Sequence, residues 1–569
     1  MTQRARSGGE AGLWLEAMLA ALARQGRTEW FGSPPHLISI AGPRADGFTV
    51  FPRDFRPARA ETGQAILAGH WSLAGQPMTT GPRGDPWNRP NPSRGFAEAL
   101  HRFGWLRHLL AAGEEGAREG LRLVDEWRLT FGRWSSFSWS GPLLERRVLN
   151  LACAMGGLTP IASEAEVEML ANLLARQARQ LWITRDPDWR RAERAVAASV
   201  AAAALSGKAS DRLMAHARGR LDRLLAQTVL PDGGHVSRSP EAGLELLFDL
   251  LALDDGLAQR GLECPPEAAR AIDRLAAGVR FFTLADGALA CFQGGETVDA
   301  ARIAAAVVSA GARDEGESGP PPDQAPHAGY HRLAARRIQV MADVGRPAPR
   351  PWSVSACAQP GAIEVVCDAE RLITNSGWSL RAPNAQAQRL TDAGSTAALG
   401  HESAGDPLGG WAGRTLGPRL VGGVSQIETQ RASTEAGVWL VSSHDGFAKS
   451  LGLMHERRIY LATTADELRG EDRFTPTRPD LAARVIPYVV HFHLPPEVQA
   501  VVARDNQSVL IRGASDQGWW LRNDAGEVRI EPATHFKDGR QLPATQVMLM
   551  GHIRADKGGR VRWKLTAVE

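Results

Sequence analysis

The spacing of hydrophobic residues divides the chain into a helical first part and a β-rich second part. Between residues 95 and 310, apolar residues recur at i, i+3, i+4 and i+7 in about ten runs, most of which end near Gly, Pro or Asp. Two runs, residues 195–205 and 244–253, are almost wholly apolar or Ala-rich, as expected for the inner helices of a double layer. Short connections between so many helices favour an incomplete α/α toroid over a four-helix bundle.

Beyond residue 328 the period of the apolar pattern changes from 3.6 to 2. Segments such as residues 337–341, 363–366, 489–494 and 508–511 alternate in the way that half-buried strands do, and turn signals recur at short intervals. Because no helical runs separate these strands, the pattern predicts an antiparallel β-sandwich.

The domain boundaries follow from these changes of period. Residues 311–327 are charged and then proline-rich, which predicts a mobile linker. We therefore expect an N-terminal helix and irregular segment packed on the toroid (1–94), the toroid itself (95–310), the linker, and the β-sandwich (328–569).

Composition narrows the classes of function. The net charge of +3 over 569 residues is too small to indicate a nucleic-acid partner. Five cysteines without CxxC spacing predict neither a disulfide framework nor a cysteine zinc site. The N-terminal apolar stretch is interrupted by Glu16 and is spaced like an amphipathic helix rather than a signal peptide, and no run of about 18 apolar residues predicts a membrane span. These features favour a soluble, cytoplasmic protein.

One loop carries the best candidate chemistry. Residues 231–240 read PDGGHVSRSP and separate two helical runs, so His235 and Arg238 lie three residues apart in a glycine-rich turn. Loops between helices are a usual place to present polar groups to a ligand. The alternative is a plain helix connection with a solvated arginine.

The chain resembles the heparinase II/III-like polysaccharide lyases. The resemblance rests on the helical part followed by the β-rich part, and on five segments in order: GHWSLAG (69–75), PWNRPNPSR (86–94), DGGHVSRSP (232–240), SHDGF (443–447) and HERR (455–458). It implies β-elimination on a uronic-acid-containing polysaccharide bound between toroid and sandwich. It also implies an acidic glycan as partner, and relatives of this kind are often periplasmic or associated with the cell envelope.

The same resemblance assigns roles to particular residues. His235 matches a carboxylate-binding residue of the family, and Arg238 matches the position three residues later. Trp87, Arg89 and Arg94 are candidate substrate contacts, because Trp stacks on sugars and Arg pairs with carboxylates; the alternative is that they hold the irregular N-terminal segment on the toroid. Tyr330 is a further candidate that would approach from the β side; the alternative is a core role at the domain junction.

The chain departs from the family pattern at three positions. Phe292 stands near the expected catalytic Tyr, Gly394 in the place of the sandwich His, and Phe447 in the place of the Tyr of an HDGY segment. Phe and Gly side chains cannot transfer protons.

Some family members also bind a metal, commonly zinc, through His and Asp of the sandwich. His444 and Asp445 match that site, with His401 as a possible substitute ligand. Zinc requires three or four convergent ligands.

Three functions are consistent with these residues. The first is a polysaccharide lyase whose catalytic set includes His235, Arg238 and His444. The second is a catalytically degenerate glycan-binding or assembly protein on the same scaffold. A weaker third is hydrolysis by paired carboxylates on the toroid, for which Glu241 and Glu245 are four residues apart on one predicted helix.

Overall fold

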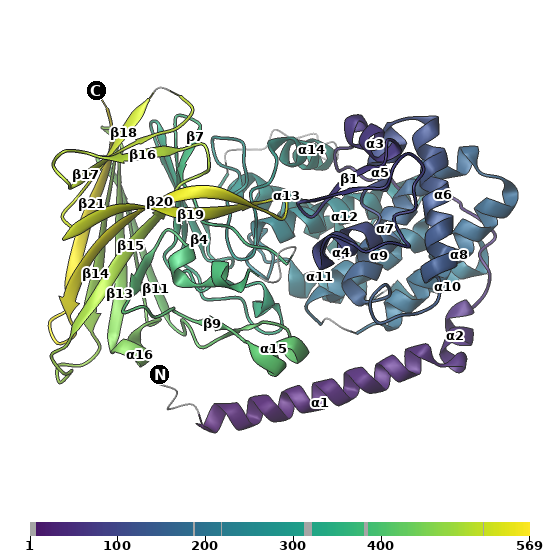
Figure 1. Ribbon diagram of the computed structural model, residues 1–569, viewed down its shortest axis with the longest axis horizontal. Helices are drawn as coiled ribbons and strands as arrows, with labels where there is room; N and C mark the ends of the chain where they lie inside the picture. Colours follow the sequence, from purple (N-terminus) through teal and green to yellow (C-terminus); the bar gives the residue numbers. More distant parts are fainter. Residues whose placement is uncertain are drawn as a thin grey trace.

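The computed structural model describes residues 7–185, 188–217, 219–311, 321–380, 385–515 and 517–568. It confirms the predicted order of a helical part followed by a β-rich part, which lie side by side along the longest axis of the molecule (Figure 1). Most of the predicted linker, residues 312–320, lies outside the described residues. No helix in the described part of the chain is long and apolar enough to cross a lipid bilayer.

The helical part is a double layer arranged around one alanine-rich helix, α9 (Arg191–Ala204). Every side chain from Ala192 to Ala204 is buried, and α9 packs against α7, α8, α10, α11 and α12. Small side chains allow this many neighbours to approach one helix closely. The helices around it do not close into a barrel; they are α3 (Ala60–Leu67), α4 (Arg94–His101), α5 (Leu106–Ala111), α6 (Glu114–Phe131), α7 (Gly141–Leu158), α8 (Glu164–Ile183), α10 (Gly207–Ala217), α11 (Leu221–Thr228), α12 (Pro240–Gln259), α13 (Pro266–Phe282) and α14 (Ala300–Gly311).

The N-terminal segment contacts both parts of the molecule. Helix α1 (Ser7–Gly32) extends from α2 (Pro34–Ala41), which packs on α8, towards the β-rich part (Figure 1). There Trp14 stacks on Trp411 of α15 (Gly410–Leu416) with ring centroids 5.3 Å apart, and Glu16 pairs with Arg419. The irregular sequence that follows contains one hairpin, β1 (His70–Leu73) and β2 (Gln76–Thr79). This hairpin packs on α3 and α4 and also accepts a hydrogen bond at Ser72 from Arg540 of the β-rich part (2.8 Å), so both α1 and the hairpin contact the two parts.

The β-rich part is built from three main antiparallel sheets. An eight-stranded sheet has the order β11-β12-β13-β14-β21-β18-β17-β16, a four-stranded sheet the order β19-β20-β15-β8, and a five-stranded sheet the order β3-β4-β5-β6-β7. The strands are β3 (Gln324–Ala325), β4 (Tyr330–Ala335), β5 (Ile338–Asp343), β6 (Ile363–Cys367), β7 (Glu370–Ile373), β8 (Ala397–Leu399), β11 (Ile427–Thr434), β12 (Gly437–His444), β13 (Leu453–Ala462), β14 (Glu467–Pro476), β15 (Val485–His493), β16 (Gln499–Val502), β17 (Ser508–Arg512), β18 (Gly518–Asn523), β19 (Glu527–Lys537), β20 (Arg540–Arg554) and β21 (Gly559–Ala567). A short pair, β9 (Asp406–Pro407) with β10 (Leu420–Val421), and helix α16 (Ala448–Leu451) complete it.

The five-stranded sheet joins the two hydrophobic cores. Tyr330, Met341 and Val366 belong to the core of the helical part, whereas Leu333 and Val365, on the same strands, belong to the core of the sandwich. Since neighbouring side chains of a strand point to opposite faces, one thin sheet completes both cores. The helical and β-rich parts are therefore packed together through a continuous apolar layer.

Candidate functional site at the toroid–sandwich junction

The DGGHVSRSP loop connects α11 to α12 and is held close to α13. Gly233 has a φ of +81°, and a Cβ at this position would lie 2.0 Å from the carbonyl oxygen of Arg274. Only glycine fits such a close backbone approach in the left-handed region. A bridge between Val229 and His235 then closes the turn. Gly233 thus allows the loop to pack closely on α13. In this conformation His235 lies inside the helical part.

His235 is buried and electrically neutral. Its side chain lies within the helical part, and the residue is only 4% exposed. The backbone N–H of Ser237 donates to Nδ1 at 3.1 Å, which places the ring proton on Nε2. Burial, together with the nearby charge of Arg190, lowers the pKa of His235 to about 3. At neutral pH this imidazole carries no charge that could neutralise a uronate.

The charged neighbours of His235 are Glu193 and Arg190. Its Nε2 lies 3.8 Å from Oε1 of Glu193 and has no hydrogen-bond partner among the described residues. Arg190 donates from Nε to Glu145 at 2.9 Å and lies 3.7 Å from Glu193. Two carboxylates share one guanidinium beside a neutral imidazole, an arrangement that disfavours the approach of another anion.

Arg238 forms a buried attachment between the loop and the β-rich part. Its φ of +65° lies in the left-handed region, and the residue is 6% exposed. The guanidinium donates to the carbonyl oxygens of Ala328 (2.7 Å), Gly329 (3.1 Å) and Gly345 (3.1 Å), and it forms an ion pair with Asp343. These four acceptors belong to the β4–β5 region. The guanidinium N–H groups of Arg238 therefore bind across the domain junction.

Tyr330 belongs to the same attachment. Its hydroxyl donates to the carbonyl oxygen of Arg238 at 2.8 Å, and the Arg238 guanidinium lies over its ring at 4.8 Å from the centroid. Tyr330 is fully buried, and burial raises the pKa of its phenol well above the ordinary range. The structure therefore brings His235, Arg238 and Tyr330 into one region but leaves none of them open to solvent.

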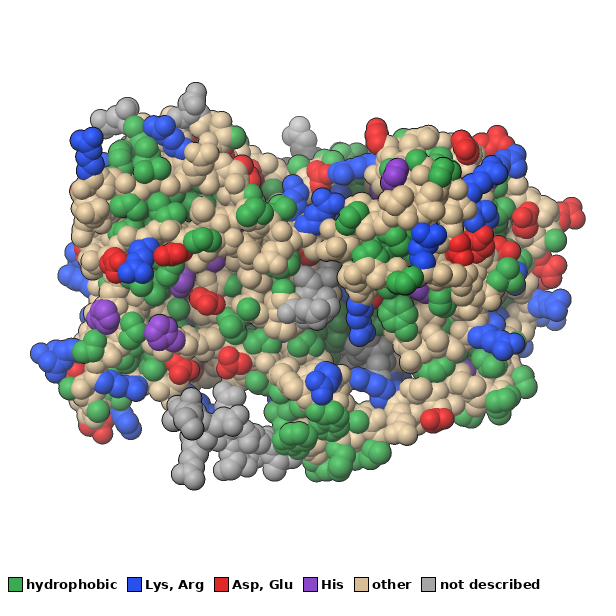
Figure 2. All heavy atoms as spheres, viewed as in Figure 1, with side chains coloured by type: hydrophobic (Ala, Val, Ile, Leu, Met, Phe, Trp, Pro, Cys, Tyr) green, Lys and Arg blue, Asp and Glu red, His purple; other side chains and the backbone are tan. Residues whose placement is uncertain are grey.

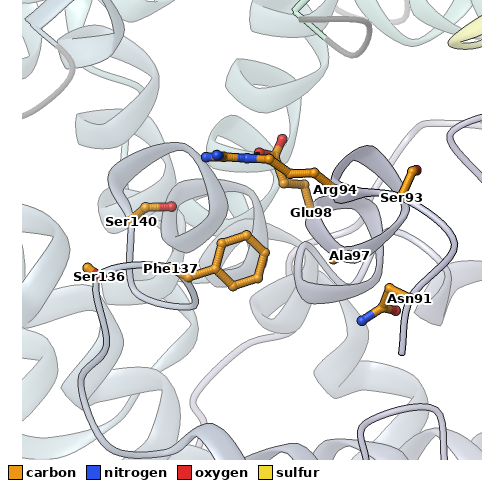
Figure 3. A pocket seen from close by; sticks show the side chains of 8 residues that line it. All are labelled: Asn91, Ser93, Arg94, Ala97, Glu98, Ser136, Phe137 and Ser140. Atoms are coloured by element: carbon orange, nitrogen blue, oxygen red, sulfur yellow. Dashed lines mark hydrogen bonds and ion pairs between the residues drawn. The ribbon is translucent and has the colours of Figure 1, made fainter. Parts of the chain in front are cut away.

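The three expected sugar-binding residues of the N-terminal segment lie elsewhere. Trp87 is buried and donates from Nε1 to the Leu123 carbonyl at 3.1 Å, while Arg89 donates to backbone carbonyls of its own segment, among them Asp85 at 2.7 Å. Of the three, Arg94 lines an open pocket with a volume of about 530 Å³, to which Trp87 and Arg89 do not contribute. There Arg94 and its ion-pair partner on α4 face an aromatic ring across the hollow (Figure 3). The full lining is Asn91, Ser93, Arg94, Ala97, Glu98, Ser136, Phe137 and Ser140, without a residue of the DGGHVSRSP loop.

The expected metal ligands do not converge. His444 accepts from the Gly446 N–H at Nδ1 (3.2 Å), and its Nε2 contacts Nδ1 of His455 at 2.9 Å, so both ring nitrogens are occupied. His455 in turn bonds to Asp472 at 2.8 Å. Burial, and then the charges of His455 and Arg457, lower the pKa of His444 well below its ordinary value.

The other two candidate ligands point to different partners. Asp445 accepts backbone N–H bonds from Ser425 (2.8 Å) and Gln426 (3.0 Å), and His401 is an exposed turn residue with a φ of +61°. Among the described residues, no group of three His, Cys, Asp or Glu side chains is arranged to hold a metal ion. The residues present at this position do not fit a zinc site.

Three positions where the family pattern has Tyr or His carry a Phe or Gly, and each of them is packed within the protein. Phe292 is buried with its ring centroid 5.4 Å from that of Tyr330, and Phe447 is fully buried beside His444. At Gly394 a Cβ would lie 2.8 Å from the side chain of Gln359, so the present packing leaves no room for an imidazole without movement of that glutamine.

Sequence reasoning missed the buried ionic network of the toroid. Asp249 pairs with both Arg56 and Arg146, and Glu245 pairs with Arg56 and Arg302. The available signal was one Asp inside the apolar run 244–253. Glu241 accepts the N–H of Glu296 at 2.9 Å. Glu241 and Glu245 are thus bonded to separate partners and do not form a pair of free carboxylates.

Removal of Asp343 should show that the junction depends on Arg238. Asp343→Ala would leave a buried guanidinium without its counter-charge, and we expect the free energy of unfolding to fall by about 3 kcal/mol in urea titrations. The matched control is Glu114→Ala, which breaks an exposed pair with Arg118 and should cost less than about 1 kcal/mol. Equal, small effects of both variants would contradict the structural role given to Arg238.

The buried histidines should make stability depend on pH. Burial lowers the pKa values of His101, His235 and His493 to about 3, whereas an unfolded histidine titrates near 6.5. Below about pH 6.5 the unfolded chain binds protons that the native protein does not, so stability is full above that pH and is lost as the pH falls towards 3. His235→Gln should reduce the slope of unfolding free energy against pH by up to about 1.4 kcal/mol per unit between pH 6 and 4. Equal slopes for the wild type and His235→Gln would contradict the burial of His235.

Comparisons with known proteins agree with this architecture. The model of the heparinase II/III-like C-terminal domain matches residues 317–564. Among solved structures, heparinase III is similar with a TM-score of 0.70 and 14% identity over 94% of this chain and 89% of that one. A mutant heparan sulfate lyase from Pedobacter heparinus is similar with a TM-score of 0.57 and 14% identity over 94% and 88%. At this identity the two structures show a shared fold.

A curated relative covers nearly the whole chain. FtsZ-localized protein C of Caulobacter vibrioides (strain NA1000 / CB15N) is 50% identical over 564 residues, which are 98% of this chain and 96% of the relative. Together with the toroid, the sandwich and the matching C-terminal domain, these similarities show that the chain belongs to the heparinase II/III-like family.

Proposed function

We propose that this protein is an assembly protein on the lyase scaffold, one that acts together with FtsZ and does not carry out β-elimination. One observation carries the proposal: the candidate proton-transfer groups near the family positions are buried within the protein. His235, Tyr330 and His444 are at most 4% exposed. Their neighbours are other parts of this chain.

The chemistry of β-elimination sets a demanding requirement. The C5 proton of a uronate becomes acidic enough only when a positive or hydrogen-bonding group stabilises the carboxylate, and a base and an acid must then act on either side of the sugar. Here the imidazole of His235 is neutral and lies beside Glu193, and Arg238 is committed to Asp343 and three carbonyls. The remaining proton-transfer positions carry Phe292, Gly394 and Phe447.

The curated relative supports the second half of the proposal. That protein is named for its localisation with FtsZ, and the similarity extends over nearly the full length of both chains. Because identity of 50% spans the toroid as well as the sandwich, the surfaces of both parts are candidates for a shared interaction.

The proposal is tested by measuring activity and association on the same preparation. We expect no rise in the ultraviolet absorbance of unsaturated uronate when the protein is incubated with a panel of uronate polymers between pH 5 and 9. We expect the protein to pellet with polymerised FtsZ in the presence of GTP and to stay in the supernatant when GTP is omitted. Product formation that His235→Ala abolishes, or failure to pellet with FtsZ polymers, would contradict the proposal.

A lyase of acidic polysaccharides is the second candidate, and one observation favours it. Nε2 of His235 and Oε2 of Glu193 are both buried without hydrogen-bond partners among the described residues, which is unusual for native proteins. A hydroxyl group of a substrate would satisfy both atoms if the junction opened. In that case Arg94, beside Phe137 in the open pocket, is the exposed candidate for contact with the glycan.

A further inference from the structure

The outer face of the eight-stranded sheet carries a row of aromatic and cationic side chains. Five neighbouring strands, β12, β13, β14, β21 and β18, place one residue each at the same level, because the pairs 439–460, 460–469, 469–564 and 564–522 are directly opposite in the ladder. Neighbouring strands lie about 4.8 Å apart, so the row is continuous. We name it the outer row: Trp439, Tyr460, Arg469, Lys564 and Arg522.

The outer face of the eight-stranded sheet carries a net positive charge. The outward positions of this sheet carry eight arginine or lysine side chains and four glutamates, whereas the whole chain has a net charge of only +3. The glutamates are shared: Glu467 pairs with both Arg469 and Lys564, and Glu471 pairs with Arg562 at 2.9 Å. The cations are Arg458, Arg469, Arg473, Arg512, Arg522, Arg560, Arg562 and Lys564, and the carboxylates are Glu428, Glu456, Glu467 and Glu471.

The outer row is open to solvent. The eight-stranded sheet lies at the end of the molecule farthest from the helical part, and Lys and Arg side chains are visible along that edge (Figures 1 and 2). Its inward side chains, such as Leu468 and Trp563, fill the sandwich core. On the outer side Trp439 is 43% exposed, and the Arg469 side chain is 59% exposed. A tryptophan left open beside a basic surface is typical of an interaction site.

The ring faces in this row favour a protein over a glycan. Tyr460 has Trp439 at 4.6 Å between ring centroids and the Arg469 guanidinium at 5.8 Å, and Arg522 lies 5.6 Å from the ring of Trp520. A sugar would need a flat, open ring face on which to stack, but Tyr460 and Trp520 each have a guanidinium over the ring. The guanidiniums instead present their donors to carboxylates.

The pattern of charge also distinguishes a protein partner from a membrane. Anionic lipid surfaces attract clusters of basic residues without regard to register. Here glutamates alternate with the cations, as in the cross-strand pairs Glu456–Arg473 and Arg458–Glu471. Interspersed charges give specificity for a partner whose own charges are arranged to match.

We propose that the outer row docks an acidic segment of FtsZ that carries an apolar side chain beside its carboxylates. This inference rests on the proposed function, since it names the surface through which the assembly protein binds FtsZ. The carboxylates pair with Arg469, Lys564 and Arg522, and the apolar side chain covers Trp439.

The test is a charge reversal of the row in the full-length protein. The variant Arg469→Glu/Lys564→Glu/Arg522→Glu should weaken co-pelleting with FtsZ polymers by about tenfold or more, because interfacial charge pairs become repulsive. The matched control is Arg118→Glu/Arg128→Glu/Arg270→Glu, which reverses three helical arginines that are also paired with carboxylates and should bind like the wild type. The conservative variant Arg469→Lys/Arg522→Lys should retain most of the binding.

Further readouts separate the outcomes. Thermal melts establish that each variant is folded, and poly-L-glutamate should compete with FtsZ for the wild type in a salt-dependent way. If the wild type binds FtsZ and the reversed row binds equally well, the docking site is wrong while the proposed function stands. If the wild type does not bind FtsZ at all, the proposed function fails. Binding of anionic phospholipid vesicles that the reversal abolishes, with FtsZ binding unchanged, would assign the row to a membrane and overturn the inference.

Discussion

The arrangement of the helical and β-rich parts depends on the buried hydrogen bonds and ion pair of the Arg238 guanidinium. It joins the turn between α11 and α12 to the region of β4 and β5, where three carbonyls and Asp343 satisfy its donors. A charge in this environment is tolerated only when its hydrogen bonds and counter-charge are complete. The five-stranded sheet that receives it completes both hydrophobic cores, so the position of the sandwich relative to the toroid is fixed by the same contacts.

Because Arg238 holds the two parts together, the loop that carries the family motif is buried and does not form an open site. The loop keeps the sequence of a lyase segment, but its side chains turn into the protein: His235 towards Glu193 and Arg238 towards Asp343. In the sandwich, His444 takes part in a chain of hydrogen bonds that ends at Asp472. These buried contacts contribute to the stability of the fold, and the proposed interaction with FtsZ is assigned to the outer surface of the eight-stranded sheet.

The sequence predicted the fold better than it predicted the environment of the candidate site. Periodicity alone separates helices from strands, and the almost wholly apolar, alanine-rich run 195–205 predicts an inner helix, which the structure confirms as α9. Helix α1 extends beyond the apolar stretch Leu13–Leu22 to Ser7 and Gly32, through charged and glycine-containing flanks that carry no apolar pattern.

The site could not be predicted from local sequence, because the relevant partners are distant in the chain. Glu193 lies 42 residues before His235, and Asp343 lies 105 residues after Arg238. The spacing of His235 and Arg238 located the loop correctly, but only the packing of Gly233 on α13 determines which way it faces. Phe292, Gly394 and Phe447, by contrast, are departures from the family pattern that the sequence alone shows, because Phe and Gly have no titratable side chain in any environment.

The state of His235 tests the central claim most directly, because a lyase would bring this imidazole against the substrate. In protein labelled with ¹⁵N-histidine, with His235→Gln used to assign the signal, the two ring nitrogens report both protonation and contact with a ligand. The account predicts a neutral ring at pH 7 with its proton on Nε2, and no change of either signal when uronate oligosaccharides are added to saturating concentration. A protonated ring at pH 7, or a shift of Nε2 that follows the concentration of the oligosaccharide, would contradict it.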